Sequence, residues 1–326
     1  MKTKYLVGVF MCALAWQSQA MSGPRILVPD LAPASILGEK DFAEFKALRE
    51  RLEADSAMSL TDEQRLFALT TKAVTELESK AGFKNTAGAQ HPWSWGLYLL
   101  GSAAFNYGSS LYDAKREAEA LTTLDVGLAA TEKCVHTKSG DASFHITPCR
   151  FMKGSLTSKI ASINGILSAL SKAKGVLDEW TSAADGDVDL VMSKTHTLKA
   201  SANYALGLFY RLVPDLWLVN MIFDVRGNLD ESVRRHQIST KIQSENACYL
   251  YGEYTSLVCR SQKRSRSDDM SLADKVRDHV AALKAESTLL ARCKISVKKI
   301  SEDPKMACGF TGAKQVNEDE ANKIGK

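Results

Sequence analysis

The hydrophobic positions of the chain recur at steps of three and four residues over most of its length. Phe42, Phe45, Leu48 and Leu52 form the first such stripe, and this spacing is typical of one face of an amphipathic helix. Runs of Val, Ile and Thr that alternate with polar residues, the usual signature of strands, are almost absent from the sequence. The pattern therefore predicts an all-α fold.

Start and stop signals divide this pattern into helices. Thr61 and Gln64 have the spacing of a capping box, and Gly82 is suited to end the helix that they begin. The expected helices cover residues 39–54, 61–82, 93–112, 114–134, 153–184, 189–212, 229–257 and 271–300. We expect residues 39–316 to form a single domain, preceded by an extended N-terminal arm over 21–38 and followed by a flexible tail over 317–326.

Residues 1–20 have the pattern of a secretory signal peptide. Two lysines precede an apolar run from Tyr5 to Trp16, and small residues lead up to Ala20, as signal peptidase prefers. The run is shorter than the about 20 apolar residues of a membrane-spanning helix, and Met11 before Cys12 does not fit a lipoprotein signal. We therefore expect cleavage after Ala20 and a soluble, periplasmic or secreted protein.

The cysteines support this location. Without Cys12 an even number remains, and these cysteines fall into near neighbours along the chain. An even set in an exported protein predicts disulfide bonds. Local pairing is the simplest arrangement, although other connectivities are open. The expected bridges are Cys134–Cys149, Cys248–Cys259 and Cys293–Cys308.

The first cysteine pair has an alternative chemistry. His136 and His145 lie between Cys134 and Cys149, and two cysteines with two histidines are a common zinc-ligand set. Oxidation competes for the same thiols in an exported chain. We therefore favour the disulfide and expect no metal.

Composition and charge exclude several classes of function. The chain is 45% hydrophobic and 25% charged, which is ordinary for a globular protein. Its formal net charge of +4 is small for a nucleic-acid-binding protein. The sequence contains no GxSxG, HExxH, GxGxxG, Walker or CxxC motif. We therefore expect a binding or scaffold protein that is not an enzyme and needs no cofactor.

Two segments share an order of residues that is typical of paired repeat helices. Trp95 precedes Leu100-Gly101 in the first, and Leu206-Gly207 precedes Pro214 in the second. The glycine of each pair allows a partner helix to approach closely. This order resembles the tetratricopeptide repeat, and the resemblance implies helical hairpins packed as a compact α-solenoid or bundle.

Together with the export signal, these segments resemble the T-component family of periplasmic TRAP-transporter-associated proteins. The resemblance covers roughly residues 93–245. It implies an accessory role in solute transport, a solute-binding protein as partner, a cleft for a hydrophobic ligand and, in some members, a trimer. The cysteine pairs and the missing lipid anchor depart from this family.

Aromatic and aliphatic residues of the two segments form the candidate binding surface. Helical repeats bind through their concave face, and Pro214 must interrupt its helix. We therefore expect an apolar cleft that takes a partner protein or an apolar small molecule. The candidate ligand-binding residues are Phe209, Tyr210, Trp217, Met221, Trp95 and Tyr98.

Three other interpretations are open. The basic run from Arg260 to Arg266 meets either an acidic partner, anionic lipid headgroups or only solvent. A helical hydrolase would use dispersed groups such as Glu231 and His236. A purely structural envelope protein would bury all its aromatic residues and present no apolar patch.

Overall fold

The computed structural model of the chain describes residues 25–27, 34–54, 56, 58–213, 215–284 and 288–309. The predicted signal peptide and the predicted tail lie outside these residues. The helices are α2 (Ala34–Leu37), α3 (Glu39–Glu53), α4 (Leu60–Lys80), α5 (Ser94–Asp113), α6 (Glu117–His136), α7 (Thr147–Ile163), α8 (Ile166–Asp185), α9 (Leu198–Leu212), α10 (Trp217–Phe223), α11 (Leu229–Ile242), α12 (Ala247–Arg264), α13 (Ser267–Ala282), α14 (Thr288–Glu302) and the 3-10 helix η1 (Pro304–Cys308).

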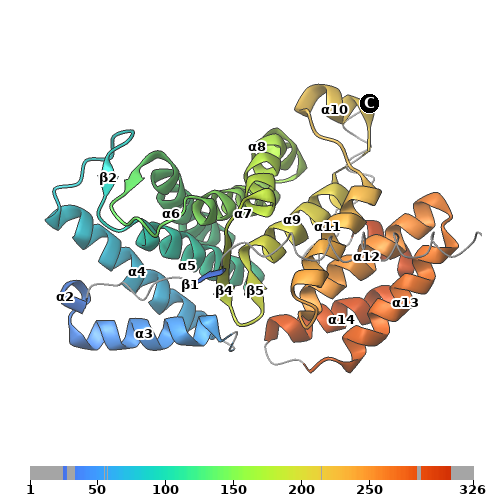
Figure 1. Cartoon of the computed structure of the whole chain (residues 1–326), viewed down its shortest axis with the longest axis horizontal. Coiled ribbons are helices and arrows are strands. Elements are labelled where there is room, and N and C mark those ends of the chain that lie inside the picture. The colour runs from blue at the N-terminus through green and yellow to red at the C-terminus, as the bar shows by residue number, and fades with distance from the viewer. Residues whose placement is uncertain are drawn as a thin grey trace, which may run out of the picture.

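The protein is all-α, as the hydrophobic pattern predicts. Successive helices pack against each other as hairpins, from α4 with α5 to α12 with α13. They form a row that extends from α3 and α4 on one side to α13 and α14 on the other (Figure 1). In the described part of the chain, no helix is long and apolar enough to cross a membrane.

Short strands join segments that are distant in sequence. β1 (Arg25–Leu27) pairs in parallel with β4 (Asp189–Ser193), which pairs antiparallel with β5 (His196–Thr197). β2 (Gln90–His91) pairs in parallel with β3 (Lys138–Ser139). The expected N-terminal arm is therefore not wholly extended: β1 is extended, but the arm also contains the short helix α2.

The apolar core falls into two main clusters. The larger cluster joins residues from α2 to α10 and the loop after α10, and the smaller one joins residues from α11 to η1. Between them, the interface of α9, α11 and α12 is partly polar. The buried Ser232 hydroxyl donates to the Gly207 carbonyl at 2.7 Å and lies 2.8 Å from the Ser256 hydroxyl.

Each predicted Leu-Gly pair lies at a close helix crossing. A Cβ atom on Gly101 would lie 2.4 Å from Cγ2 of Thr131 in α6, and one on Gly207 would lie 2.6 Å from the His236 ring in α11. These separations are too short for real carbon atoms, so a larger residue would force the helices apart. The expected role of both glycines is confirmed.

Several expected helix boundaries are wrong. Residues 189–197 form β4 and β5, and α9 begins at Leu198, because a short apolar run fits strand and helix patterns equally well. The cap of α4 is Ser59 rather than Thr61. The Ser59 hydroxyl accepts from the Asp62 amide, and the Asp62 carboxylate accepts from the Ser59 amide at 2.9 Å.

Three expected long helices are each broken in two. The first breaks at Gly165, whose φ of 100° favours glycine. The second breaks before Asn246, whose side chain accepts from the amides of Cys248 and Tyr249 and so begins α12. The third break, between α13 and α14, includes residues outside the described part of the chain.

The described part of the chain contains three disulfide bonds. Cys134–Cys149 is the expected pair, but the other two expected pairs are wrong, since the bonds are Cys248–Cys293 and Cys259–Cys308. Cys248 and Cys259 both lie on α12, and a helix rising about 1.5 Å per residue holds them too far apart to bond. The bridges instead tie α12 to α14 and to η1. They close loops of 45 and 49 residues, worth about 4 kcal/mol each in the chain-entropy model.

His236 lies at the centre of the α9–α11–α12 interface. Its ring is enclosed between Gly207 and Gly252 and is 5.3 Å from the Tyr204 ring, measured between centroids. Neither ring nitrogen has a hydrogen-bond partner among the described residues. Burial, assisted by the nearby Arg211 guanidinium, holds the pKa of His236 well below its usual range. The buried imidazole is therefore neutral.

Replacing Gly127 with Ala should lower the free energy of unfolding by about 1–3 kcal/mol. The new Cβ would lie 2.5 Å from the Ala104 Cβ, so α5 and α6 must separate. Gly175→Ala in α8 is the matched control, because a Cβ there meets nothing within 4 Å. The control should raise stability by up to about 1 kcal/mol. Urea unfolding measures both variants, and equal effects would contradict the close contact.

His236 should make stability fall as the pH drops below its unfolded-state pKa of about 6.5. The unfolded chain then binds a proton that the folded chain excludes, which costs about 1.4 kcal/mol per pH unit until the folded-state pKa is reached. The pKa of His91 is also lowered. In the wild-type protein, both His91 and His236 therefore make the free energy of unfolding fall as the pH drops. His236→Leu should remove the His236 contribution, so the free energy of unfolding, measured with urea, should fall less steeply between pH 6.5 and 5. Val233→Ala, on the same helix, should lower stability equally at every pH, and an unchanged slope in His236→Leu would refute this account.

Candidate functional site

A cavity of about 590 Å³ opens where α5 begins, and both residues of β2 line it. Its walls come from α4, from β2 and the residues that lead into α5, and from the turn at the end of β3. The lining residues are Leu77, Gln90, His91, Pro92, Trp93, Ser94, Trp95, Ser139, Gly140 and Asp141. This volume lies within the about 300–1,000 Å³ that is typical of ligand sites.

The pairing of β2 with β3 builds the cavity from distant parts of the chain. Gln90 lies opposite Lys138, and His91 lies opposite Ser139. The Cys134–Cys149 bond joins α6 to α7 and closes the loop that carries Ser139, Gly140 and Asp141. This wall of the cavity is therefore tied to the helices at both of its ends.

His91 fixes the start of α5. Its Nδ1 accepts from the backbone N–H of Trp93 at 3.0 Å, so its proton is on Nε2, which donates to Glu78 Oε1 at 2.8 Å. Lys133 lies 2.7 Å from the same carboxylate. Burial raises the pKa of Glu78, but the hydrogen bonds from Lys133 and His91 outweigh it and lower that pKa. Burial also lowers the pKa of His91, so its imidazole is neutral.

Asp141 supplies the negative charge of the cavity. Its Oδ1 accepts from the Ser143 hydroxyl at 2.7 Å and from the Ser143 amide at 2.8 Å. These bonds, with a smaller contribution from the Trp95 indole, lower the pKa of Asp141. The carboxylate is therefore ionised at neutral pH, and the described lining residues include no lysine or arginine to pair with it.

The wall formed by α5 is rich in hydrogen-bond donors. Trp93 and Trp95 are 6% and 1% exposed, and neither indole N–H has a well-formed hydrogen bond among the described residues. Trp93 is also the N-cap of α5 and provides no side-chain cap. The Gly96 amide donates to the Trp93 carbonyl at 3.0 Å, whereas the amides of Ser94 and Trp95 have no capping side chain. A buried donor without an acceptor costs about 1–3 kcal/mol.

The predicted ligand-binding residues lie in two separate places. Trp95 lines the cavity, and Tyr98, one turn later on α5, is buried with its ring centroid 6.1 Å from that of Trp95. On α9, Phe209 is buried and Tyr210 is half-buried. Met221 is exposed on α10. Of the residues that line the cavity, the sequence predicts only Trp95 as a ligand-binding residue, since the opposite wall lies far away in the sequence.

α10 carries a second candidate surface. Leu216, Met221 and Ile222 are 41%, 63% and 55% exposed, and α10 projects from the row of helices (Figure 1). The side chain of Trp217, although on this helix, lies outside the described side chains. Exposed apolar residues gathered on one element are typical of contact surfaces.

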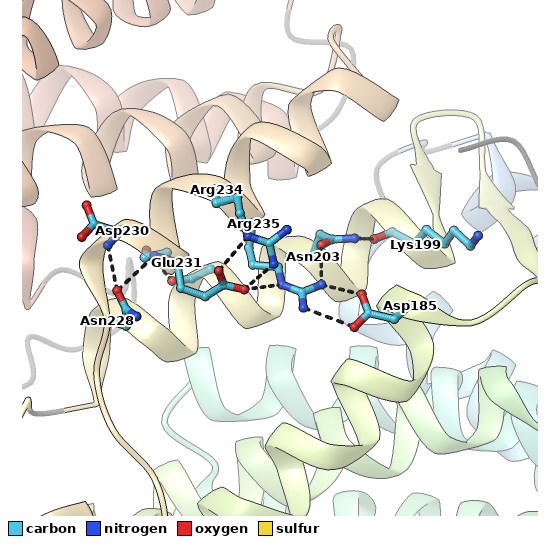
Figure 2. A network of polar contacts seen from close by, with 10 residues as sticks. Asp185, Lys199, Asn203, Asn228, Asp230, Glu231, Arg234 and Arg235 are labelled. Carbon is cyan, nitrogen blue, oxygen red and sulfur yellow. Dashed lines mark hydrogen bonds and ion pairs between the residues drawn. The ribbon is translucent and has the colours of Figure 1, made fainter. Parts of the chain in front are cut away.

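A polar network joins α8, α9 and α11 (Figure 2). Arg235 donates to Asp185 at 2.7 Å, to Glu231 at 2.9 Å and to Asn203 at 3.1 Å. Arg234 donates to Glu231 at 2.7 Å, and this bond first, followed by that from Arg235, lowers the pKa of Glu231. Glu231, which a hydrolase would use as an acid or base, is therefore held as an ion-pair partner.

Ser193 and His196 resemble a nucleophile and its base, with Oγ 3.0 Å from Nδ1. The hydrogen bonds of Asn246 determine which nitrogen of the His196 ring carries the proton. Its Oδ1 accepts from the amides of Cys248 and Tyr249, so its Nδ2 faces His196 Nε2 at 3.3 Å. A nitrogen that accepts from Nδ2 leaves the ring proton on Nδ1. His196 Nδ1 thus donates toward Ser193 Oγ and Thr195 Oγ1, each 3.0 Å away, instead of taking a proton, and these contacts stabilise the β4–β5 turn.

Ion pairs partly neutralise the basic run after Cys259. Arg260 donates to both oxygens of Asp269, at 2.8 and 2.6 Å, and lies 3.1 Å from Asp230. Asp230 also pairs with Arg264 and lies 3.8 Å from Arg266. These ion pairs favour a solvated surface over a binding site for anions.

The bond between Cys134 and Cys149 consumes the two thiols of the alternative zinc site. His136, which is nearer to Cys134 in the sequence than His145 is, forms a 2.7 Å hydrogen bond between its Nδ1 and the Glu132 carbonyl.

No protein-family model matches the chain, and the comparison with curated proteins finds no match either.

Proposed function

We propose that the protein is an exported helical binding protein that holds a small molecule in the cavity at the start of α5. The cavity itself carries this proposal, because it combines about 590 Å³ of space with aromatic and polar walls. The β2–β3 pairing and the Cys134–Cys149 bond brace those walls before any ligand binds, which lowers the cost of ordering a site. The signal-peptide pattern and the three disulfide bonds support export.

The environments of three histidines favour binding over catalysis. A general base needs a nitrogen that can reach a bound substrate. Both ring nitrogens of His91 are engaged within the fold, and the ring proton of His196 faces Ser193. His236 is completely enclosed. The proposal therefore assigns no catalytic residue.

A partner protein at α10 is the second candidate, favoured by the exposed side chains of Leu216, Met221 and Ile222. The resemblance to TRAP-associated proteins adds an accessory role in solute transport to this candidate. The cavity is preferred because its polar groups can distinguish one ligand from another, whereas the described α10 surface offers mainly apolar contact.

Filling the cavity should abolish binding of a neutral apolar probe such as N-phenyl-1-naphthylamine. In Ser139→Phe the new ring enters the cavity while the backbone pairing of β3 is kept. We expect the fluorescence-measured Kd to weaken by at least about tenfold. Ser271→Phe, at an exposed position on α13, should bind like wild type.

A variant with Leu216, Met221 and Ile222 all changed to Ser separates the two candidates. It should keep probe binding, because the cavity is intact. Loss of binding in this variant, with normal binding in Ser139→Phe, would place the site at α10 and overturn the proposal.

A further inference from the structure

We infer that the cavity at the start of α5 binds an uncharged polyhydroxy molecule of the monosaccharide or disaccharide class. This inference rests on the proposed function of the same cavity. It follows from the charge of the lining groups, from the balance of hydrogen-bond donors and acceptors, and from the apolar part of the wall.

The charge of the lining disfavours an anionic ligand. Asp141 is ionised, His91 is neutral, and the described lining residues include no lysine or arginine. The nearby cation Lys133 is already paired with Glu78 at 2.7 Å. A carboxylate or phosphate would therefore lose its water beside a like charge, without gaining a counter-ion.

A cationic ligand is also disfavoured, for a different reason. Trp93, Ser94 and Trp95 are the N-cap and first residues of α5 and line the same cavity as Asp141. A helix N-terminus is equivalent to about half a positive charge, which opposes the attraction of Asp141 for a cation. An ammonium group also has no lone pair for the donors on this wall. The partly cancelled charge and the donors on this wall together favour a neutral ligand that carries lone pairs.

The hydrogen-bonding groups of the cavity require a ligand that both donates and accepts. The carboxylate of Asp141 only accepts, whereas the backbone amides of Ser94 and Trp95, two lining residues in the first turn of α5, only donate. Ser94, Ser139 and the amide side chain of Gln90 can do both. A hydroxyl group is the simplest ligand group that serves both kinds of partner.

The remaining wall is apolar. Leu77, Pro92 and Trp93 line the cavity beside these polar groups. A sugar ring has the matching character, with hydroxyl groups around its edge and C–H groups on its faces. Such mixed sites, mostly apolar with a few placed polar groups, give both affinity and orientation.

Three sugars that share one ring and differ in charge test this inference. We expect glucose to displace N-phenyl-1-naphthylamine with a Kd at least about tenfold tighter than that of glucosamine or glucuronate. Asp141→Asn should weaken glucose binding about tenfold, and Gln90→Leu should weaken it without any change in charge. Asp268→Asn, the same chemical change at an exposed position on α13, should leave it unaltered.

The possible failures separate this inference from the proposed function. Equal or tighter binding of glucosamine or glucuronate overturns the inference. Probe binding that no sugar displaces also overturns it, while the proposed function stands. Absence of probe binding to the wild-type protein overturns both.

Discussion

The close approach of neighbouring helices at glycine is the constraint on which the rest of the structure depends. Gly101 and Gly127 allow α5 and α6 to pack at a separation that no side chain would tolerate. This crossing sets where the end of α6 lies relative to the start of α5, and there the Cys134 Sγ is 3.8 Å from the Ser94 carbonyl oxygen. The cavity lies at this junction, so its shape follows from the helix packing behind it.

The disulfide bonds stabilise two separate regions of the molecule. The Cys134–Cys149 bond closes the loop that forms one wall of the cavity. The Cys248–Cys293 and Cys259–Cys308 bonds hold α12, α14 and η1 together. Arg211 adds a link across the core, since its buried guanidinium donates from α9 to the Ala307 carbonyl in η1. Loops closed over such lengths stabilise the fold chiefly by restricting the unfolded chain. The C-terminal helices are thus fixed covalently where their apolar cluster is small.

Local patterns in the sequence predict the features of the fold that depend on residues close together in the chain. Three- and four-residue spacing predicts the helices, and the Leu-Gly pairs predict two close crossings, both of which the structure confirms. Long-range pairing is not encoded in such patterns. The continuous helical pattern hides the break before Asn246 and places the end of the helix at residue 257, before Cys259. α12 in fact continues to Arg264 and holds Cys248 and Cys259 on one helix, so the two cysteines cannot bond to each other. Similarly, β2 and β3 join Gln90 to Lys138 across the whole of α5 and α6, so spacing alone indicates only the Trp95 side of the cavity. Of the apolar cleft expected around Tyr210 and Trp217, Phe209 is buried and Tyr210 is half-buried, since burial is the usual fate of large apolar side chains.

The most direct test of the central claim is the indole N–H region of the ¹H–¹⁵N NMR spectrum during titration with N-phenyl-1-naphthylamine. Trp93 and Trp95 flank the cavity, whereas Trp180 lies in α8 and donates to the Ser155 hydroxyl at 3.3 Å. If a small molecule binds at the start of α5, the Trp93 and Trp95 signals shift to saturation together and the Trp180 signal stays in place. Saturable binding that leaves the Trp93 and Trp95 signals unmoved would contradict the account.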